Sequence, residues 1–132
     1  EIYQCDWSSD VCSSDLPLKE LRRLVTLQRA YNHMNAGDLA VERKENEKAL
    51  AEYRRAAELV PDSAEMVYWH AVALVNMGRV DESMPLFGRV FARDDHWATL
   101  TPRLAQVGLL PDDAALLRRI LATRAGGATS PR

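Results

Sequence analysis

Hydrophobic residues recur at spacings of three and four along most of the chain. In the first such stretch they include Leu18, Leu21, Leu24 and Val25, and Lys, Arg and Glu lie between them. This spacing puts apolar side chains on one face of a helix, whereas the strict alternation typical of strands is nearly lacking. The pattern predicts an all-α fold of about six helical segments, at residues 18–44, 46–59, 63–77, 80–93, 96–107 and 113–123.

Short polar, glycine or proline stretches separate these segments, each with the length of a turn between helices. We expect Asp62 and Glu65, three residues apart, to form a capping box at the start of the third segment. Asn46 and Asp112 are expected to cap the second and sixth segments. Gly78 stands where the end of the third segment needs a left-handed residue.

The third segment is apolar nearly all round between residues 66 and 75. A helix of this kind is covered on several sides, so we expect it at the centre of the fold. The flanking segments are amphipathic, as outer elements should be.

An internal repeat links the second and fourth segments, because residues 49–56 align with residues 83–90 at a constant offset of 34. That offset is the tetratricopeptide period. The matched positions pair small with small and aromatic with aromatic: Gly37 with Ala71, Ala49 with Ser83, Tyr53 with Phe87, and Ala56 with Val90. Pro61 closes the first copy, and Lys44 stands where Gly78 stands one repeat later.

On these residues the chain resembles a tetratricopeptide repeat (TPR) protein. The resemblance implies a superhelix of antiparallel helix hairpins sharing a hydrophobic seam, since one hairpin cannot bury its apolar stripe alone. We expect a TPR-like domain at residues 17–124, with repeats at about 30–63 and 64–97 and a degenerate capping hairpin at 97–123. Residues 125–132 are expected to form a disordered tail.

Residues 1–16 resemble translated sequencing-adapter DNA rather than natural protein. Residues 6–16, Asp-Trp-Ser-Ser-Asp-Val-Cys-Ser-Ser-Asp-Leu, agree codon by codon with one reading frame of a common library adapter. We therefore expect a disordered leader and exclude it from fold reasoning. Both cysteines, Cys5 and Cys12, lie within it, so their spacing says nothing about disulfides, metal or redox compartment.

Removing the leader changes the charge balance. It holds four acidic residues and no basic one, so the 17 basic and 19 acidic residues of the whole chain become 17 and 15. The resulting charge of about +2 is too small to indicate nucleic acid or an acidic membrane surface as partner. No apolar run approaches the length of a membrane span.

Catalytic and metal-site signals are thin. His33, His70 and His96 are widely spaced, and no carboxylate recurs at ligand spacing beside them. The acid pairs at residues 94–95 and 112–113 sit at turns before helices, where capping explains them. Ser83 lacks the glycine context of a nucleophile elbow. We therefore predict no enzyme activity, no cofactor and no metal.

Binding is the function that remains. In TPR proteins the first helix of each pair lines a concave groove, so the resemblance places nine residues on such a face: Tyr31, Met34, Asp38, Val41, Glu65, Tyr68, Val72, Val75 and Asn76. Only Asn76 matches the Lys, Arg and Asn side chains that grip a peptide C-terminal carboxylate in some relatives. The expected partner is a protein or peptide, which includes the chain's own upstream domain or a second copy, with no nucleic acid and no membrane.

A closer resemblance covers residues 17–123. The motifs Ala-Leu-Ala-x-Tyr-Arg-Arg-Ala, Trp-His-Ala-Val-Ala-Leu and Gly-Leu-Leu-Pro-Asp-Asp are similar to the C-terminal region of the bacterial family called domain of unknown function, number 1028. In that family the upstream domain is similar to N-terminal-nucleophile hydrolases. The alternative function is thus an accessory region of such an enzyme, its catalytic domain encoded upstream of Pro17. The sequence leaves the ligand, the oligomeric state and the compartment open; cytoplasmic is our expectation for the last.

Deleting residues 1–16 is expected to leave the helical circular-dichroism signal and the melting temperature nearly unchanged, because an adapter-derived segment has no place in the core. Thermal melts of the full and shortened chains measure this. A loss of several degrees on deletion would contradict the interpretation.

Overall fold

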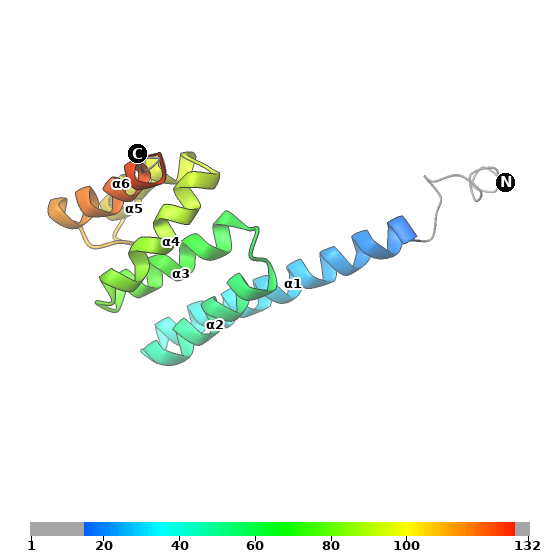
Figure 1. Ribbon diagram of the computed structural model, residues 1–132. Coiled ribbons are helices and arrows are strands. Elements are labelled where there is room, and N and C mark those ends of the chain that lie inside the picture. The colour runs from blue at the N-terminus through cyan, green and yellow to red at the C-terminus, as the bar shows by residue number, and fades with distance from the viewer. Residues whose placement is uncertain (1–14, 129–132) are drawn as a thin grey trace.

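The computed structural model describes residues 15–128, so residues 1–14 of the expected leader and residues 129–132 of the expected tail lie outside it. Residues 15–16 and 125–128, which we expected to be disordered, are helical. Within the described range it contains six α-helices and no strand, which confirms the predicted all-α fold. The helices are α1 (Asp15–Glu42), α2 (Asn46–Leu59), α3 (Ala64–Asn76), α4 (Val80–Arg93), α5 (His96–Gln106) and α6 (Ala114–Ala128) (Figure 1).

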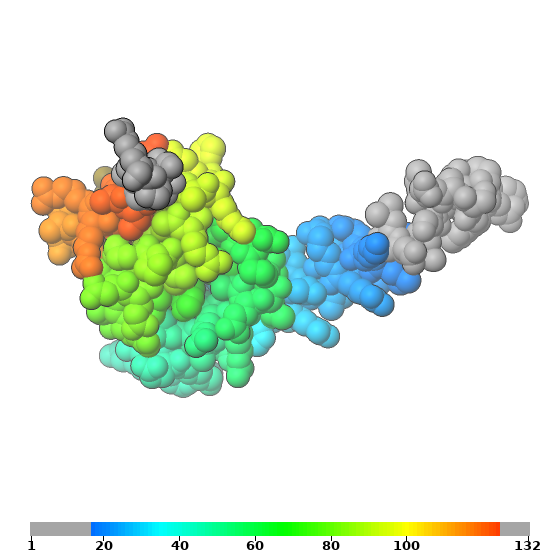
Figure 2. Space-filling view, in the orientation of Figure 1, coloured from blue at the N-terminus to red at the C-terminus, as the bar shows by residue number. Residues whose placement is uncertain are grey.

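Successive helices pair as hairpins. The second half of α1 packs on α2, α3 packs on α4, and α2 also packs on α3, which joins the first two hairpins. The last pair packs against α4, which contacts both α5 and α6. The first half of α1 extends well away from this body as a single helix (Figures 1 and 2).

The first helix of each hairpin ends in the same backbone motif. Lys44, Gly78 and Gly108 have φ angles of 61°, 80° and 80°, the left-handed conformation that glycine adopts most readily. At each end the next amide donates to the carbonyl five residues earlier, as Glu45 N does to Ala40 O at 2.8 Å. These are Schellman ends. The prediction for Gly78 is confirmed, and Lys44 takes the same conformation at its equivalent position.

The predicted capping box at the start of α3 is wrong by one residue. Ser63 is the N-cap, and its hydroxyl accepts from the amide of Met66 at 3.4 Å. Asp62 instead accepts from the guanidinium of Arg93 at 3.0 Å. The segment before α3 is therefore tied to the end of α4 rather than to the helix that it precedes.

The caps predicted for α2 and α6 also differ. Asn46 is the first residue of α2, and no side-chain hydrogen bond caps that helix. At α6 the cap is Asp113 rather than Asp112, because its carboxylate accepts from the amides of Ala115 and Leu116. The amide of Asp113 donates to the carbonyl of Pro111 at 2.9 Å, so the chain turns at Asp112 and the helix starts one residue later.

Helix α1 approaches α2 closely at Gly37. A Cβ placed on Gly37 would lie 2.7 Å from Cε1 of Tyr53, closer than carbon atoms pack. The ring of Tyr53 therefore occupies the space that any larger residue at position 37 would need. One repeat later, Ala71 and Phe87 are both fully buried in one cluster, as their pairing with Gly37 and Tyr53 predicts.

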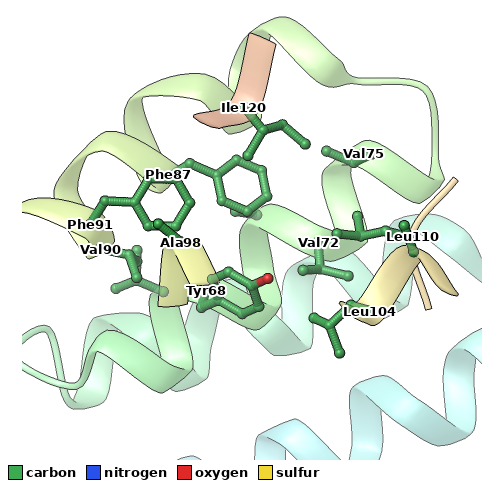
Figure 3. Close-up of a cluster of buried hydrophobic side chains, with 13 residues drawn as sticks. Tyr68, Val72, Val75, Phe87, Val90, Phe91, Ala98, Leu104, Leu110 and Ile120 are labelled. Atoms are coloured by element: carbon green, nitrogen blue, oxygen red, sulfur yellow. The ribbon is translucent and has the colours of Figure 1, made fainter. Parts of the chain in front are cut away.

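The core consists of two clusters joined through α3, rather than the one continuous seam that we expected. One cluster lies around α1 and α2 and takes Met66, Ala73 and Leu74 from α3. The other lies around α3 to α6, where Tyr68, Val72, Phe87 and Ile120 meet (Figure 3). Eight of the thirteen residues of α3 are buried, which confirms its predicted central position.

Substituting Gly37→Ala is expected to destabilise the protein by about 1 to 3 kcal/mol, because the added methyl group collides with the buried ring of Tyr53. Gly88→Ala is the matched control within α4, since a Cβ there meets Thr123 only at 3.8 Å. It should stabilise by about 1 kcal/mol through helix propensity. Urea unfolding of both variants measures the difference, and equal effects would contradict the close approach at Gly37.

Candidate functional site

The nine residues expected on the concave face divide into two groups. Met34, Tyr68, Val72 and Val75 are buried, with at most 8% of each exposed. Of these, Val72 lines a surface recess. The other five, which are Tyr31, Asp38, Val41, Glu65 and Asn76, keep part of their surface open to solvent.

Tyr68 is buried because α5 packs over the side of α3 that carries it. Its ring lies 4.6 Å from that of Trp97 and 5.6 Å from that of Phe87, measured between centroids. Thr101 donates its hydroxyl proton to the carbonyl of Trp97 at 2.7 Å, so the Tyr68 hydroxyl is the donor in their 2.9 Å contact. Tyr68 is therefore a satisfied core residue, and burial raises its pKa.

A groove of about 300 Å³ lies between α1 and α3. Four predicted residues line it: Asp38, Val41, Val72 and Asn76. Six residues that sequence reasoning missed complete the lining: Asn46, Tyr53, Trp69, Ala73, Met77 and Leu109. The groove is mostly apolar, and its only charged lining residue is Asp38.

Two hydrogen bonds fix the positions of the polar side chains Asp38 and Asn76 in this groove. The Tyr53 hydroxyl donates to the carboxylate of Asp38 at 2.5 Å, so α2 fixes the acid of α1. Burial, with the nearby Asp38 carboxylate, raises the pKa of Tyr53 well above its ordinary value. The Asn76 amide donates to the carbonyl of Leu109 at 3.0 Å, which holds the α5–α6 connection against the end of α3.

The remaining two predicted residues bond to each other outside this lining. Tyr31 donates its hydroxyl proton to the Glu65 carboxylate at 2.9 Å, which connects α1 with the first turn of α3. This bond raises the pKa of Tyr31. The pair therefore joins the first hairpin to the second.

A helical pattern in the sequence could have found half of the missed residues. Trp69, Ala73 and Met77 are four residues apart and share a stripe with Asn76 on α3, which the TPR positions alone did not include. Leu109 carried no such signal, because its position depends on the path of the connection between α5 and α6.

A second recess of about 440 Å³ lies on the other side of α3, between α2 and α4. Its charges are already paired, since Arg79 contacts Glu82 at 2.8 Å and Glu47 at 3.8 Å. His70 lies half-buried in it, and its pKa is lowered first by burial and then by Arg54. Charges satisfied in this way leave the recess little attraction for a charged ligand.

Two of the three histidines and the acid pair at residues 94–95 have local partners. His33 contacts Glu52 at 2.5 Å, and His96 contacts Asp94 at 2.8 Å, which lowers the pKa of Asp94. Asp95 pairs with Arg124 at 2.6 Å. Across residues 15–128, no group of three or more His, Cys, Asp and Glu side chains is arranged to hold a metal ion.

Ser83 is fully buried and donates its hydroxyl proton to the carbonyl of Val80 at 2.6 Å. It fills the small packing position of α4 that the repeat alignment assigned to it. In the described part of the chain, no helix has both the length and the apolar character needed to cross a bilayer.

Replacing Tyr53→Phe is expected to lower stability by about 1 kcal/mol at neutral pH, because the Asp38 bond is lost. A raised pKa keeps Tyr53 neutral when folded, whereas tyrosine in the unfolded chain ionises near pH 10. Stability from this group is thus complete below about pH 10 and is lost as pH rises further.

Urea unfolding at about pH 8 and pH 10.5 measures both effects. Tyr53→Phe should lose less stability on going to the higher pH than the parent chain does. Tyr31→Phe serves as the control, because its hydroxyl is exposed and its removal should change the alkaline loss less. If Tyr53→Phe loses as much stability between the two pH values as the parent chain does, the buried, hydrogen-bonded role of Tyr53 is contradicted.

Comparison with known proteins agrees with this architecture. A family model described as TPR repeat matches residues 37–78, from the contact glycine of α1 to the left-handed glycine after α3. No curated protein and no solved structure gave a significant match. Residues 37–78 are therefore similar to a TPR repeat, and the described residues form an all-α, TPR-like stack of helical hairpins.

Proposed function

We propose that this chain is a non-catalytic interaction module that binds an extended segment of a partner protein in the groove between α1 and α3. TPR repeats generally bind proteins or peptides, and the match at residues 37–78 covers much of the groove's lining. The observation that carries the proposal is the groove itself, which is apolar, open to solvent and placed where the first helices of two hairpins face each other.

The lining favours a particular kind of segment. Val41 is 46% exposed and Leu109 is 47% exposed, so both offer apolar surface that an aliphatic or aromatic side chain would cover. Asp38 has oxygen lone pairs beyond the one that Tyr53 uses, and these accept from backbone N–H groups or a cationic side chain. Since the lining contains no Lys or Arg, a C-terminal carboxylate is disfavoured.

Peptides selected against the full chain from a displayed random library test this proposal. Val41→Asp should weaken binding of the selected peptides at least about tenfold, because a charge replaces apolar surface in the groove. Leu39→Asp is the matched control on the same helix, since Leu39 is 52% exposed but does not line the groove.

The two variants should melt within a few degrees of the parent chain, because both positions are exposed. Peptides that bind Val41→Asp as tightly as the parent chain would overturn the proposed site. A selection that yields no specific peptide would overturn the function.

A second candidate function is an accessory region of an enzyme similar to N-terminal-nucleophile hydrolases. It is favoured by the resemblance of motifs between α2 and the α5–α6 connection to the family called domain of unknown function, number 1028. Sequencing the intact gene upstream of the codon for Pro17 tests it. A hydrolase-like domain encoded there would support this function, and any other domain would exclude it.

A further inference from the structure

The first half of α1 carries an apolar stripe that the described chain leaves uncovered. Residues 17–25 are all exposed, and the first buried residue of the helix after them is Ala30. The stripe consists of Leu18, Leu21, Leu24 and Val25, which are between 44% and 57% exposed. This part of α1 projects away from the body (Figure 2).

The spacing of the stripe fits a second helix. Leu18, Leu21 and Val25 follow one another at three and four residues, which is the a/d spacing of a seam between two helices. Leu24 lies beside this seam and widens it. From Leu18 to Val25 the seam is two helical turns long, roughly 11 Å at 1.5 Å per residue.

The same seam becomes polar further along α1. Continuing the three and four spacing gives Gln28, Asn32 and Asn35, all exposed, and Gln28 donates to Asn32 at 3.1 Å. A further hairpin stacked along α1 would bury these amides, at a cost unless each found a partner. The seam therefore suits one short helix at the projecting end rather than another repeat.

Charge indicates the chemistry of that helix. Residues 17–29 carry Lys19, Arg22, Arg23 and Arg29 but only one acid, Glu20, which is paired with Arg23 at 2.7 Å. Arg22 and Arg29 follow the d positions Leu21 and Gln28 by one residue, so they flank the same edge of the seam. If two copies of this helix paired antiparallel, the same edge of each copy would face the other, and the arginines would lie opposite arginines.

We propose that residues 17–29 of α1 dock a short acidic amphipathic helix of another protein, with its apolar face on Leu18, Leu21 and Val25 and its carboxylates opposite Arg22 and Arg29. This surface is separate from the groove between α1 and α3, and the proposal does not depend on the groove's function. An anionic membrane would meet the same basic charge, but arginines flank only one edge of the seam and its apolar part ends after two turns.

Two synthetic peptides test the proposal with the full chain. Each has three heptads with Leu at a and d; one carries Glu at e and g, and the other carries Lys there. Fluorescence anisotropy should show the Glu peptide binding about tenfold tighter at low salt, with the preference shrinking as salt screens the charges. Because the whole chain has a formal charge of -2, general attraction would favour the Lys peptide instead.

Variants locate the contact. Arg22→Glu with Arg29→Glu should reverse the preference, whereas Arg103→Glu with Arg118→Glu, an equal charge change elsewhere, should leave it intact. Leu21→Asp with Val25→Asp should abolish binding of the Glu peptide without lowering the melting temperature, since both side chains are exposed. Val41→Asp should leave this binding unchanged, which separates the result from the groove.

Three results would overturn the proposal. The first is equal affinity for the two peptides, or a preference that survives Arg22→Glu with Arg29→Glu. The second is a concentration-dependent dimer in sedimentation that Leu21→Asp dissolves, which would make a second copy the occupant. The third is binding to phosphatidylserine-containing vesicles that the Glu peptide does not compete away, which would make the occupant a membrane.

Discussion

The close approach of α1 and α2 at Gly37 is the constraint on which the first hairpin depends. The ring of Tyr53 fills the volume that a side chain at position 37 would take, so the pair packs in one register. The same Tyr53 reaches past this contact with its hydroxyl and holds Asp38 at the groove. One aromatic residue thus fixes both the hairpin and an acceptor of the candidate binding site.

Helix α3 connects the first hairpin to the rest of the molecule. It contributes Met66 to the cluster around α1 and α2 and Tyr68 to the cluster around α4, α5 and α6. Because it is covered on both sides, it forms a rigid wall of the groove, and Val72 and Trp69 present fixed apolar surface there. No described helix covers the projecting half of α1. The groove therefore lies against the core, whereas the apolar stripe of residues 17–25 lies away from it.

Local signals in the sequence were sufficient for the helices, the repeat and its packing positions. Gly78 and Gly37 do what their backbone freedom and small size predict, and Lys44 follows its repeat equivalent into a left-handed conformation. The concave face was harder to predict. In each hairpin a small residue lies seven positions before the left-handed residue that ends the first helix; these residues are Gly37, Ala71 and Thr101. The third hairpin, however, follows the second by 30 residues rather than 34.

That shorter offset hid the way α5 covers Tyr68, so a residue assigned to ligand contact is a core residue bonded to Thr101. Leu109 was missed because its place depends on a loop path with no sequence period. The caps Ser63 and Asp113 were each misplaced by one residue, since neighbouring polar residues compete for one role and tertiary contacts such as that of Asp62 with Arg93 decide between them.

The most direct test is a nuclear Overhauser spectrum of the isotope-labelled chain: the account predicts strong contacts from the Tyr53 ring protons to the Hα protons of Gly37, and matching ones from the Phe87 ring to the Ala71 methyl group. Ring contacts confined to α2 and α4 themselves would contradict it.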